Sequence, residues 1–423
     1  MAEMKDSGIE WIGMIPKNWN VDKIKYHLKR NEPKNPGNVE VLSVYREYGV
    51  IPKNSRDDNH NITSEDTSKY KYVKKGDLVI NKMKAWQGSM GVSEYEGIVS
   101  PAYFVYNFTD NYFDKKYFHF LIRNCYKDEF RRISGGIREG QWDLSADLFA
   151  NELVLIPPIK EQIKIVEFLN TKCAEIDTLY SDIEKQIETL EEYKKSIITE
   201  AVTKGLDPDV EMKDSGIELI GQIPNEWKIS RLGWISKKIG DGIHGTVTFE
   251  DGETNFYFIN GNNIKKRNIA IKDNTQRITE RIYNTYKTNL TTHTILISLN
   301  GTIGNLAFYN NENVLLGKSV GFIELKEEYN REYIYYLLQA NYIKTIFELS
   351  FAGTTINNLS LQTLRKTNVL LPPKTEQKKI VKYLDKKCAE IDGAIEEKKE
   401  QLDTLEQYKK SVIYEYVTGK KSS

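Results

Sequence analysis

Residues 155–205 read LIPPIKEQIKIVEFLNTKCAEIDTLYSDIEKQIETLEEYKKSIITEAVTKG. A closely similar sequence, LLPPKTEQKKIVKYLDKKCAEIDGAIEEKKEQLDTLEQYKKSVIYEYVTGK, occupies residues 370–420 at a constant displacement of 215. In the first copy, apolar residues recur at alternating steps of three and four, which is typical of a coiled-coil seam rather than of a plain surface helix. Pro157-Pro158 and Gly205 bound this pattern. The repeat therefore predicts two long helices.

The second copy has a weaker seam, because Lys398 interrupts one apolar row and Gly393 costs about 1 kcal/mol in a helix interior. One strong and one weak partner in the same chain favour an intramolecular pair, with each helix about 65–70 Å long at 1.5 Å per residue. The predicted core of this helix pair consists of Val166, Leu169, Cys173, Ile176, Ile183, Ile187, Leu190, Val381, Leu384, Cys388, Ile391, Ile395, Leu402 and Leu405.

A second repeat precedes each long variable block. MKDSGIEWIGMIPKNW at residues 4–19 returns as MKDSGIELIGQIPNEW at residues 212–227. The chain is therefore a tandem duplication, and its two units could be related by a pseudo-twofold axis. The predicted segments are a leader repeat (1–19), a first variable block (20–154), a first long helix with its linker (155–211), a second leader repeat (212–227), a second variable block (228–369) and a second long helix (370–423).

The two variable blocks share a skeleton but little sequence. Short apolar strands, such as residues 76–81 and 294–298, lead into glycine-containing turns, and each block carries one amphipathic helix, expected at 117–130 and 333–347. Short strands with glycine turns and one helix predict a compact α+β domain in each block. A skeleton that is kept while the exposed residues differ suits paired readers of two different targets.

Composition bounds the partners only loosely. The chain has 423 residues, zero formal net charge and three cysteines. Zero net charge gives no overall electrostatic attraction to nucleic acid, and three cysteines do not indicate a set of structural disulfides. The sequence contains no signal peptide and no apolar run that could span a bilayer, so we expect a cytoplasmic protein without a membrane partner. The variable blocks lean basic and the first long helix is acidic, which indicates that the helices complement each other and avoid DNA; a solvated acidic face is the alternative.

A search for catalytic motifs finds none that is complete. Gly317-Lys318-Ser319 is not a nucleotide-binding loop, because Glu312 stands where that motif requires glycine. Ile156 and Leu371 precede the Pro-Pro pairs where an amino-methyltransferase needs a hydrogen-bonding residue. The five histidines are scattered, with no pair at metal-ligand spacing. We therefore expect no catalytic residue and no metal site in this chain.

Polar and basic residues in the predicted loops of both blocks remain as candidates for DNA contact. Arg and Lys can read guanine, Asn and Gln can read adenine, and Lys, Ser and Thr also hold phosphates. The alternative for each residue is ordinary turn chemistry, and Trp86, like the nearby candidate Trp142, also fits a core. The candidate DNA-binding residues are Lys82, Lys84, Trp86, Gln87, Arg138, Gln141, His244, Thr246, Asn260, Asn263, Asn300, Thr302, Thr354, Thr355, Asn357 and Asn358.

These motifs together resemble the specificity subunit of type I restriction-modification systems over essentially the full chain. The leader repeats carry the resemblance, as do the Pro-Pro-x-x-Glu-Gln helix starts at 157–162 and 372–377. The Tyr-Lys-Lys-Ser motif, at 193–196 and 408–411, also contributes. Within the second block, Asn-Gly-Thr-Ile-Gly (300–304) and Gly-Thr-Thr-Ile (353–356) resemble the target-recognition domains of that family. The doubled combination is specific, whereas each motif alone is weak.

The resemblance implies a DNA-binding subunit without catalysis. Its two target-recognition domains would read the two halves of an interrupted DNA site, and its long helices would pair antiparallel. Two modification subunits, which use S-adenosylmethionine to methylate adenine, would dock on it, and a restriction subunit that cleaves with ATP and Mg would join them. This chain would bind none of those cofactors. Two other readings remain open: an enzyme, or a coiled-coil scaffold joining two protein-binding domains.

Overall fold

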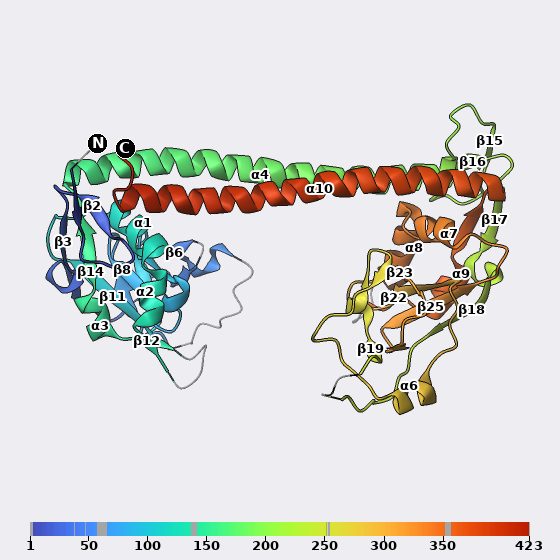
Figure 1. Cartoon of the computed structure of the whole chain (residues 1–423), viewed down its shortest axis with the longest axis horizontal. Coiled ribbons are helices and arrows are strands. Elements are labelled where there is room, and N and C mark those ends of the chain that lie inside the picture. Colours follow the sequence, from blue (N-terminus) through green and yellow to red (C-terminus); the bar gives the residue numbers. More distant parts are fainter. Residues whose placement is uncertain are drawn as a thin grey trace. The chain divides into compact units, whose positions relative to one another are not determined.

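The computed structural model describes residues 3–37, 39–46, 48–56, 66–136, 142–250, 252, 254–351 and 357–422. The chain forms two compact units, Met1–Ile183 with Lys399–Ser423 (unit 1) and Glu184–Lys398 (unit 2). Both long helices, α4 (Ile159–Lys204) and α10 (Lys374–Val417), therefore contribute one part to each unit. Figure 1 shows α4 and α10 side by side. Among the described residues, no helix is long and apolar enough to cross a membrane.

Unit 1 is built on an antiparallel four-stranded sheet in the order β4 (Leu28–Arg30), β11 (Tyr103–Phe108), β8 (Leu78–Asn81) and β9 (Met90–Val92). Smaller ladders pair β1 (Met4–Asp6) with β2 (Met14–Pro16), β3 (Asn20–Lys23) with β14 (Leu153–Ile156), β5 (Leu42–Tyr45) with β6 (Gly49–Pro52), β7 (Lys71–Val73) with β10 (Gly97–Val99), and β12 (Ser134–Gly135) with β13 (Asp143–Leu144). Its short helices are η1 (Ile24–Tyr26), η2 (Lys53–Ser55), η3 (Ala85–Gln87), α1 (Lys115–Cys125), α2 (Lys127–Arg132) and α3 (Ala146–Asn151).

Unit 2 repeats this plan with the sheet order β18 (Ser236–Asp241), β25 (Val320–Leu325), β22 (Thr294–Ser298) and β23 (Leu306–Phe308). Its ladders pair β15 (Met212–Asp214) with β16 (Gln222–Pro224), β17 (Lys228–Arg231) with β26 (Asn368–Leu371), β19 (Tyr257–Ile259) with β24 (Val314–Leu316), and β20 (Ile264–Lys265) with β21 (Asn268–Ile269). Its short helices are α5 (Leu232–Ile235), η4 (Gly261–Asn263), α6 (Glu280–Tyr286), α7 (Arg331–Leu337), α8 (Asn341–Phe351) and α9 (Leu361–Lys366). The predicted α+β class with two long paired helices is confirmed.

One expectation about the variable blocks is wrong. Each predicted amphipathic helix is two helices, α1 and α2 in unit 1 and α7 and α8 in unit 2. In unit 1 the break falls at Tyr126, whose buried hydroxyl donates to the carbonyl of Leu153 at 2.7 Å. In unit 2 the amide of Asn341, at the start of α8, donates to Thr199 Oγ1 of α4 at 3.0 Å. Neither glycine nor proline occurs at these breaks, and the spacing of apolar residues continues across them, so the sequence pattern predicts one continuous helix.

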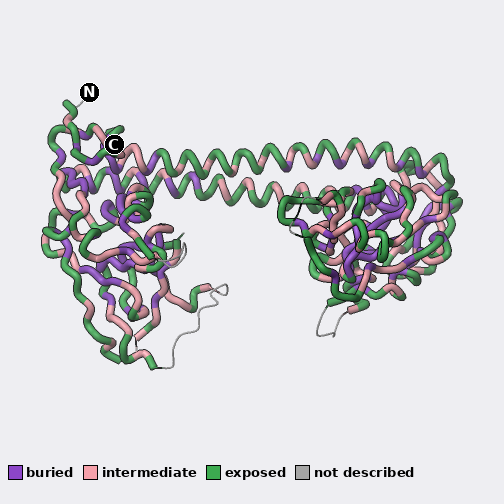
Figure 2. The backbone as a smooth tube through the Cα atoms, turned by 60° about the horizontal axis from the view of Figure 1, so that its bottom comes forward, coloured by how far each residue is buried: buried purple, intermediate pink, exposed green. Residues whose placement is uncertain are grey.

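The predicted helix-pair residues are buried or half-buried throughout. The fully buried positions are Val166, Leu169, Cys173, Ile176, Leu384, Cys388, Ile391 and Ile395, and the half-buried ones are Ile183, Ile187, Leu190, Val381, Leu402 and Leu405. Buried positions recur along both helices in Figure 2 and gather inside each globular part. A seam between only two helices leaves the edges of its side chains open to water, which accounts for the half-buried positions.

A buried tryptophan of each leader joins the beginning of one long helix to the end of the other. In unit 1, Trp19 Nε1 donates to Glu161 Oε2 at 2.7 Å, near the start of α4. The same indole packs against Gly419, which follows α10. In unit 2, Trp227 Nε1 donates to Glu376 of α10 at 3.0 Å and packs against Gly205 after α4. The two helices are therefore antiparallel in each unit.

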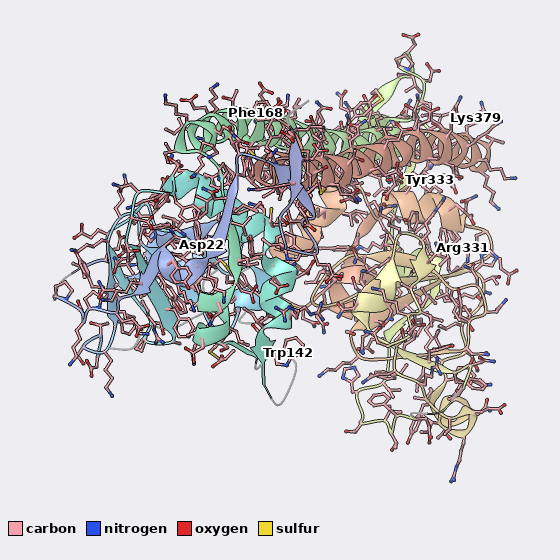
Figure 3. The ribbon with its side chains drawn as sticks, turned by 60° about the vertical axis from the view of Figure 1, so that its left-hand side comes forward. Asp22, Trp142, Phe168, Arg331, Tyr333 and Lys379 are labelled. Atoms are coloured by element: carbon pink, nitrogen blue, oxygen red, sulfur yellow. The ribbon has the colours of Figure 1, made fainter. Side chains whose placement is uncertain are left out.

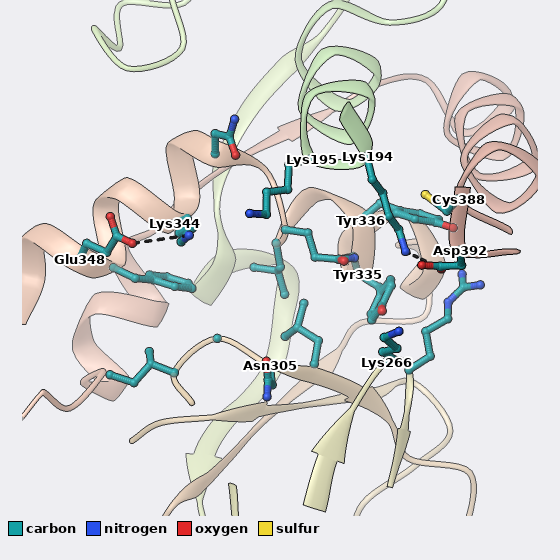
Figure 4. Close-up of a pocket in the computed structure, with 18 of the residues that line it drawn as sticks. Lys194, Lys195, Lys266, Asn305, Tyr335, Tyr336, Lys344, Glu348, Cys388 and Asp392 are labelled. Atoms are coloured by element: carbon teal, nitrogen blue, oxygen red, sulfur yellow. Dashed lines mark hydrogen bonds and ion pairs between the residues drawn. The ribbon is translucent and has the colours of Figure 1, made fainter. Parts of the chain in front are cut away.

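Reciprocal ion pairs set the register of the helices. Lys194 Nζ lies 2.5 Å from Asp392 in unit 2, drawn as a dashed line in Figure 4, and Lys409 Nζ lies 2.6 Å from Asp177 in unit 1. Both lysines belong to the repeated Tyr-Lys-Lys-Ser motif and both aspartates to the repeated Ala-Glu-Ile-Asp, so each motif contacts the other copy of its counterpart. Exposed ion pairs of this kind contribute little free energy but select one alignment.

In unit 2, Arg267 ties the globular part to α10. Its guanidinium lies 2.8 Å from Asp385 and about 5.1 Å from the ring centroids of both Tyr335 and Tyr336. The hydroxyl of Tyr336 donates to the same aspartate at 2.7 Å. In unit 1 the position equivalent to Asp385 is Asn170. Arg267 therefore makes an attachment of unit 2 that the repeated sequence does not provide in unit 1.

The hydrogen bond between Trp227 and Glu376 leads to a prediction about the stability of unit 2. Replacing Glu376 with alanine leaves the buried indole N–H of Trp227 without an acceptor, so we expect a loss of about 1–3 kcal/mol in the free energy of unfolding. Glu376→Gln keeps an acceptor oxygen and should lose less. Urea unfolding of the full chain measures both. Equal midpoints for Glu376→Ala and the unsubstituted chain would show that this hydrogen bond does not stabilise the unit.

Candidate nucleic-acid interface

In each unit, the loop after the third strand of the sheet order lies beside the residues that lead into a short helix. The first edge is defined as residues 82–89 and 142–145, and the second edge as residues 299–305 and 357–360. At the first edge, the amide of Leu144 donates to the carbonyl of Lys82 at 2.9 Å. At the second, the amide of Leu359 donates to Leu299 at 2.8 Å. The two edges therefore have the same backbone arrangement.

The repeated Leu-Ser dipeptide fixes how each edge leaves the sheet. Ser145 caps α3 by accepting from the amide of Leu148, and Ser360 caps α9 by accepting from the amide of Thr363. A serine cap pre-forms the first turn of a helix and so orients the residues before it. The same scaffold thus presents whatever side chains precede each serine.

The first edge presents cations and aromatic rings. Lys82 Nζ lies 2.7 Å from Asp143, and the ring centroids of Trp86 and Trp142 are 5.7 Å apart. Arg131 lies 6.0 Å from the ring centroid of Trp142. Figure 3 shows Trp142 at the end of unit 1 that lies away from α4. Both tryptophans are half-buried, so their rings remain accessible to a ligand.

Two further predicted residues of the first edge lie on η3 or beside it. Lys84 is exposed, and the amide oxygen of half-buried Gln87 accepts from Arg46 at 3.0 Å. Arg46 was not among the sequence candidates, because it lies in a hairpin loop far away in the sequence. The predicted residues Arg138 and Gln141 lie outside the described residues.

An open cavity of about 400 Å³ lies at the second edge of unit 2, between residues of the edge and residues from two other loops. Its wall brings together three of the sequence candidates, His244, Asn300 and Asn358. Asp241, a polar residue of the same predicted loop as His244, and Lys318 also lie in this wall. His244 Nε2 lies 2.7 Å from Asp241 Oδ2. Lys318 was rejected with the false nucleotide-binding motif, so its position in this wall is new information from the structure.

Other predicted residues of unit 2 do not share this wall. Asn260 and Asn263 form a reciprocal cap on η4, in which Asn263 Oδ1 accepts from the amide of Asn260 at 3.0 Å. The amide nitrogen of Asn263 also donates to the carbonyl of Ala270 at 2.8 Å. Thr246, Thr302 and Asn357 are exposed, and Thr354 and Thr355 lie outside the described residues. The loop therefore uses two of the predicted asparagines as scaffold.

A larger cavity of about 750 Å³ lies in unit 2 between the long helices and the globular part. Its wall includes Lys194 and Asp392, Tyr335 and Tyr336, and Asn305 from the loop of the second edge (Figure 4). The ion pair and the aromatic rings already hold the domain on α10. We therefore assign this cavity to the attachment rather than to a ligand.

The two edges combine groups that can donate or accept hydrogen bonds with aromatic rings. Within the described ranges, no group of three His, Cys, Asp or Glu side chains could hold a metal ion. Burial and the neighbouring Arg123 lower the pKa of half-buried His119 to about 4, and burial raises the pKa of Tyr106 to about 12; both groups lie in unit 1 outside the first edge. The edges supply amides, ammonium groups and rings, which suit hydrogen bonding and stacking on bases.

Because some asparagine side chains make hydrogen bonds and others do not, their substitution should change the free energy of unfolding by different amounts. Asn263→Ala removes both hydrogen bonds that its side chain makes in the η4 loop, and we expect the free energy of unfolding to fall by about 1–2 kcal/mol. Asn358→Ala should leave stability within about 0.5 kcal/mol, because an exposed side chain away from such a network contributes little. Thermal unfolding of both variants tests this, and a large loss for Asn358→Ala would make it a scaffold residue.

Comparison with known protein families identifies the chain. The model of the type I restriction modification DNA specificity domain matches residues 20–189 and 224–407. The chain is 25% identical to the type I restriction enzyme MjaVIII specificity subunit of Methanocaldococcus jannaschii over 96% of this chain and 93% of that protein. It is also 24% identical to a protein of the same organism provisionally named the MjaX specificity subunit, over 97% of this chain and 95% of the relative.

Solved structures share the fold. One chain comes from a study of complex assembly and conformational transition of the type I R-M system. It matches with a TM-score of 0.67 and 15% identity, over 95% of this chain and 98% of that one. The HsdS subunit from Thermoanaerobacter tengcongensis matches with a TM-score of 0.50 and 14% identity, over 96% and 98% of the two chains. At these identities the likeness supports the fold alone.

Proposed function

This chain belongs to the type I restriction modification DNA specificity family, and we propose that each of its two units reads one part of an interrupted DNA sequence. It is a specificity subunit, the non-catalytic DNA-recognition component of a type I restriction-modification system. The relatives that match nearly the whole chain are named as specificity subunits of such enzymes. The expected resemblance is therefore confirmed.

One observation supports the proposal that the two units read two different half-sites. The two units have the same sheet order and the same backbone contact at their edges, yet the edges present different chemistry. Lys82 and the tryptophan pair lie at the first edge, whereas Asn300 and Asn358 lie at the second. A duplicated scaffold with diverged contact residues suits two different half-sites. The residues of the two edges would contact the DNA.

The chemical work in the assembly would fall to partner subunits. Modification subunits, two per specificity subunit by its pseudo-twofold repeat, would methylate adenine with S-adenosylmethionine. A restriction subunit would cleave with ATP and Mg. The role of this chain is to bind the sequence and hold those partners on it, for which it needs no cofactor of its own. The outer faces of α4 and α10 are the proposed docking surface for the modification subunits.

Binding to duplex DNA tests the proposal. The chain together with its modification partner should bind a duplex that carries its site. The logarithm of the association constant should fall linearly with the logarithm of the salt concentration. The slope reports the number of phosphates contacted. A duplex in which one half-site is scrambled serves as the control and should bind more weakly. Binding without any salt dependence, or no binding to DNA, would favour a protein-binding scaffold instead.

A further inference from the structure

The cavity at the second edge has two side-chain amides that the fold leaves unused. Asn300 and Asn358 face each other across an isolated backbone bridge. Within the described part of the chain, neither side chain makes a hydrogen bond, and Asn358 is exposed. Asn260 and Asn263 are engaged in the η4 cap. The structure thus separates two free asparagines from two that build the loop.

A rigid turn holds Lys318 at the same cavity. Gly317 has no room for a side chain, because an added Cβ would lie 2.6 Å from Asn260 Oδ1 and 2.8 Å from the ring of Phe258. Ser319 Oγ donates to Asn260 Oδ1 at 3.2 Å and accepts from the amide of Gly261 at 2.9 Å. The Gly-Lys-Ser sequence therefore fixes a turn, and the exposed Lys318 has no ion pair with any described residue.

The charges in the wall favour bases over phosphates. Asp241 as a carboxylate can only accept a hydrogen bond, so the neighbouring Nε2 of His244 is the donor and carries a proton. In the neutral tautomer that is protonated at Nε2, the Nδ1 atom of the ring is an acceptor. The wall holds one carboxylate, that of Asp241, and one ammonium group, that of Lys318, so it has no net positive charge when the imidazole of His244 is neutral. A phosphate would gain little there, whereas base edges present matching donors and acceptors.

We propose that this cavity reads purine edges in the major groove of the half-site bound by unit 2. The amides of Asn300 and Asn358 contact adenine through its N6 donor and N7 acceptor, and Lys318 contacts guanine through O6 and N7. His244 accepts from the exocyclic amino group of a neighbouring base. This assignment rests on the proposed function, since it names the bases that the second unit reads.

Selection from a random DNA library tests the assignment, with the chain bound to its modification partner. Asn358→Ala should lose preference for adenine at one position, and Lys318→Ala preference for guanine at another. In each case we expect a drop of about 5- to 150-fold in discrimination at that position. Asn274→Ala, at an exposed asparagine outside the cavity wall, is the matched control and should select the unaltered sequence.

The outcomes separate the failure of this assignment from the failure of the proposed function. If the unsubstituted complex selects a two-part sequence and both variants select it unchanged, the assignment is overturned while the function stands. A uniform loss of affinity with a shallower salt dependence for Lys318→Ala would make it a phosphate contact and overturn its guanine assignment. If the unsubstituted complex selects no sequence at all, the proposed function itself fails.

Discussion

The fold of each unit depends on a buried tryptophan of the leader, which bonds to the first turns of one long helix and packs on the end of the other. Trp19 and Trp227 make these contacts through Glu161 and Glu376. Because one side chain touches a beginning and an end, the helices must run antiparallel. The reciprocal lysine–aspartate pairs then select the alignment. Four repeated elements thus serve a single arrangement: the leader tryptophan, the Pro-Pro-x-x-Glu-Gln helix start, Tyr-Lys-Lys-Ser and Ala-Glu-Ile-Asp. This shared role explains why they are repeated together.

A scaffold held in this way leaves the edges of the recognition sheets free to differ. The backbone contact between Leu144 and Lys82 has its counterpart between Leu359 and Leu299, so the loops emerge alike. Their side chains do not: one edge offers cations and rings, the other amides. This separation of scaffold from exposed side chains allows the residues proposed to contact DNA to change without loss of the fold, which is what a specificity subunit requires.

The sequence was sufficient to predict the long helices, the duplication and the α+β class, because these follow from periodicity and repetition over many residues. It did not predict the breaks at Tyr126 and before Asn341, where tertiary contacts end a helix without glycine or proline. Among the candidate DNA contacts, the sequence could not separate Asn263, which caps a loop, from the exposed Asn358, since a capping side chain and a side chain available to a base carry the same amide. Lys318 was considered only as part of an incomplete nucleotide-binding motif, because its place in the cavity wall comes from a turn held by Asn260, which is distant in sequence.

The recognised sequence of a hybrid chain tests the central claim most directly. Residues 228–369 would be replaced by the corresponding block of another family member, and the DNA bound by the hybrid with its modification partner would be selected from a random library. Independent reading by two units predicts that one half of the recognised sequence changes and the other half stays the same. A change in both halves, or in neither, would contradict the account.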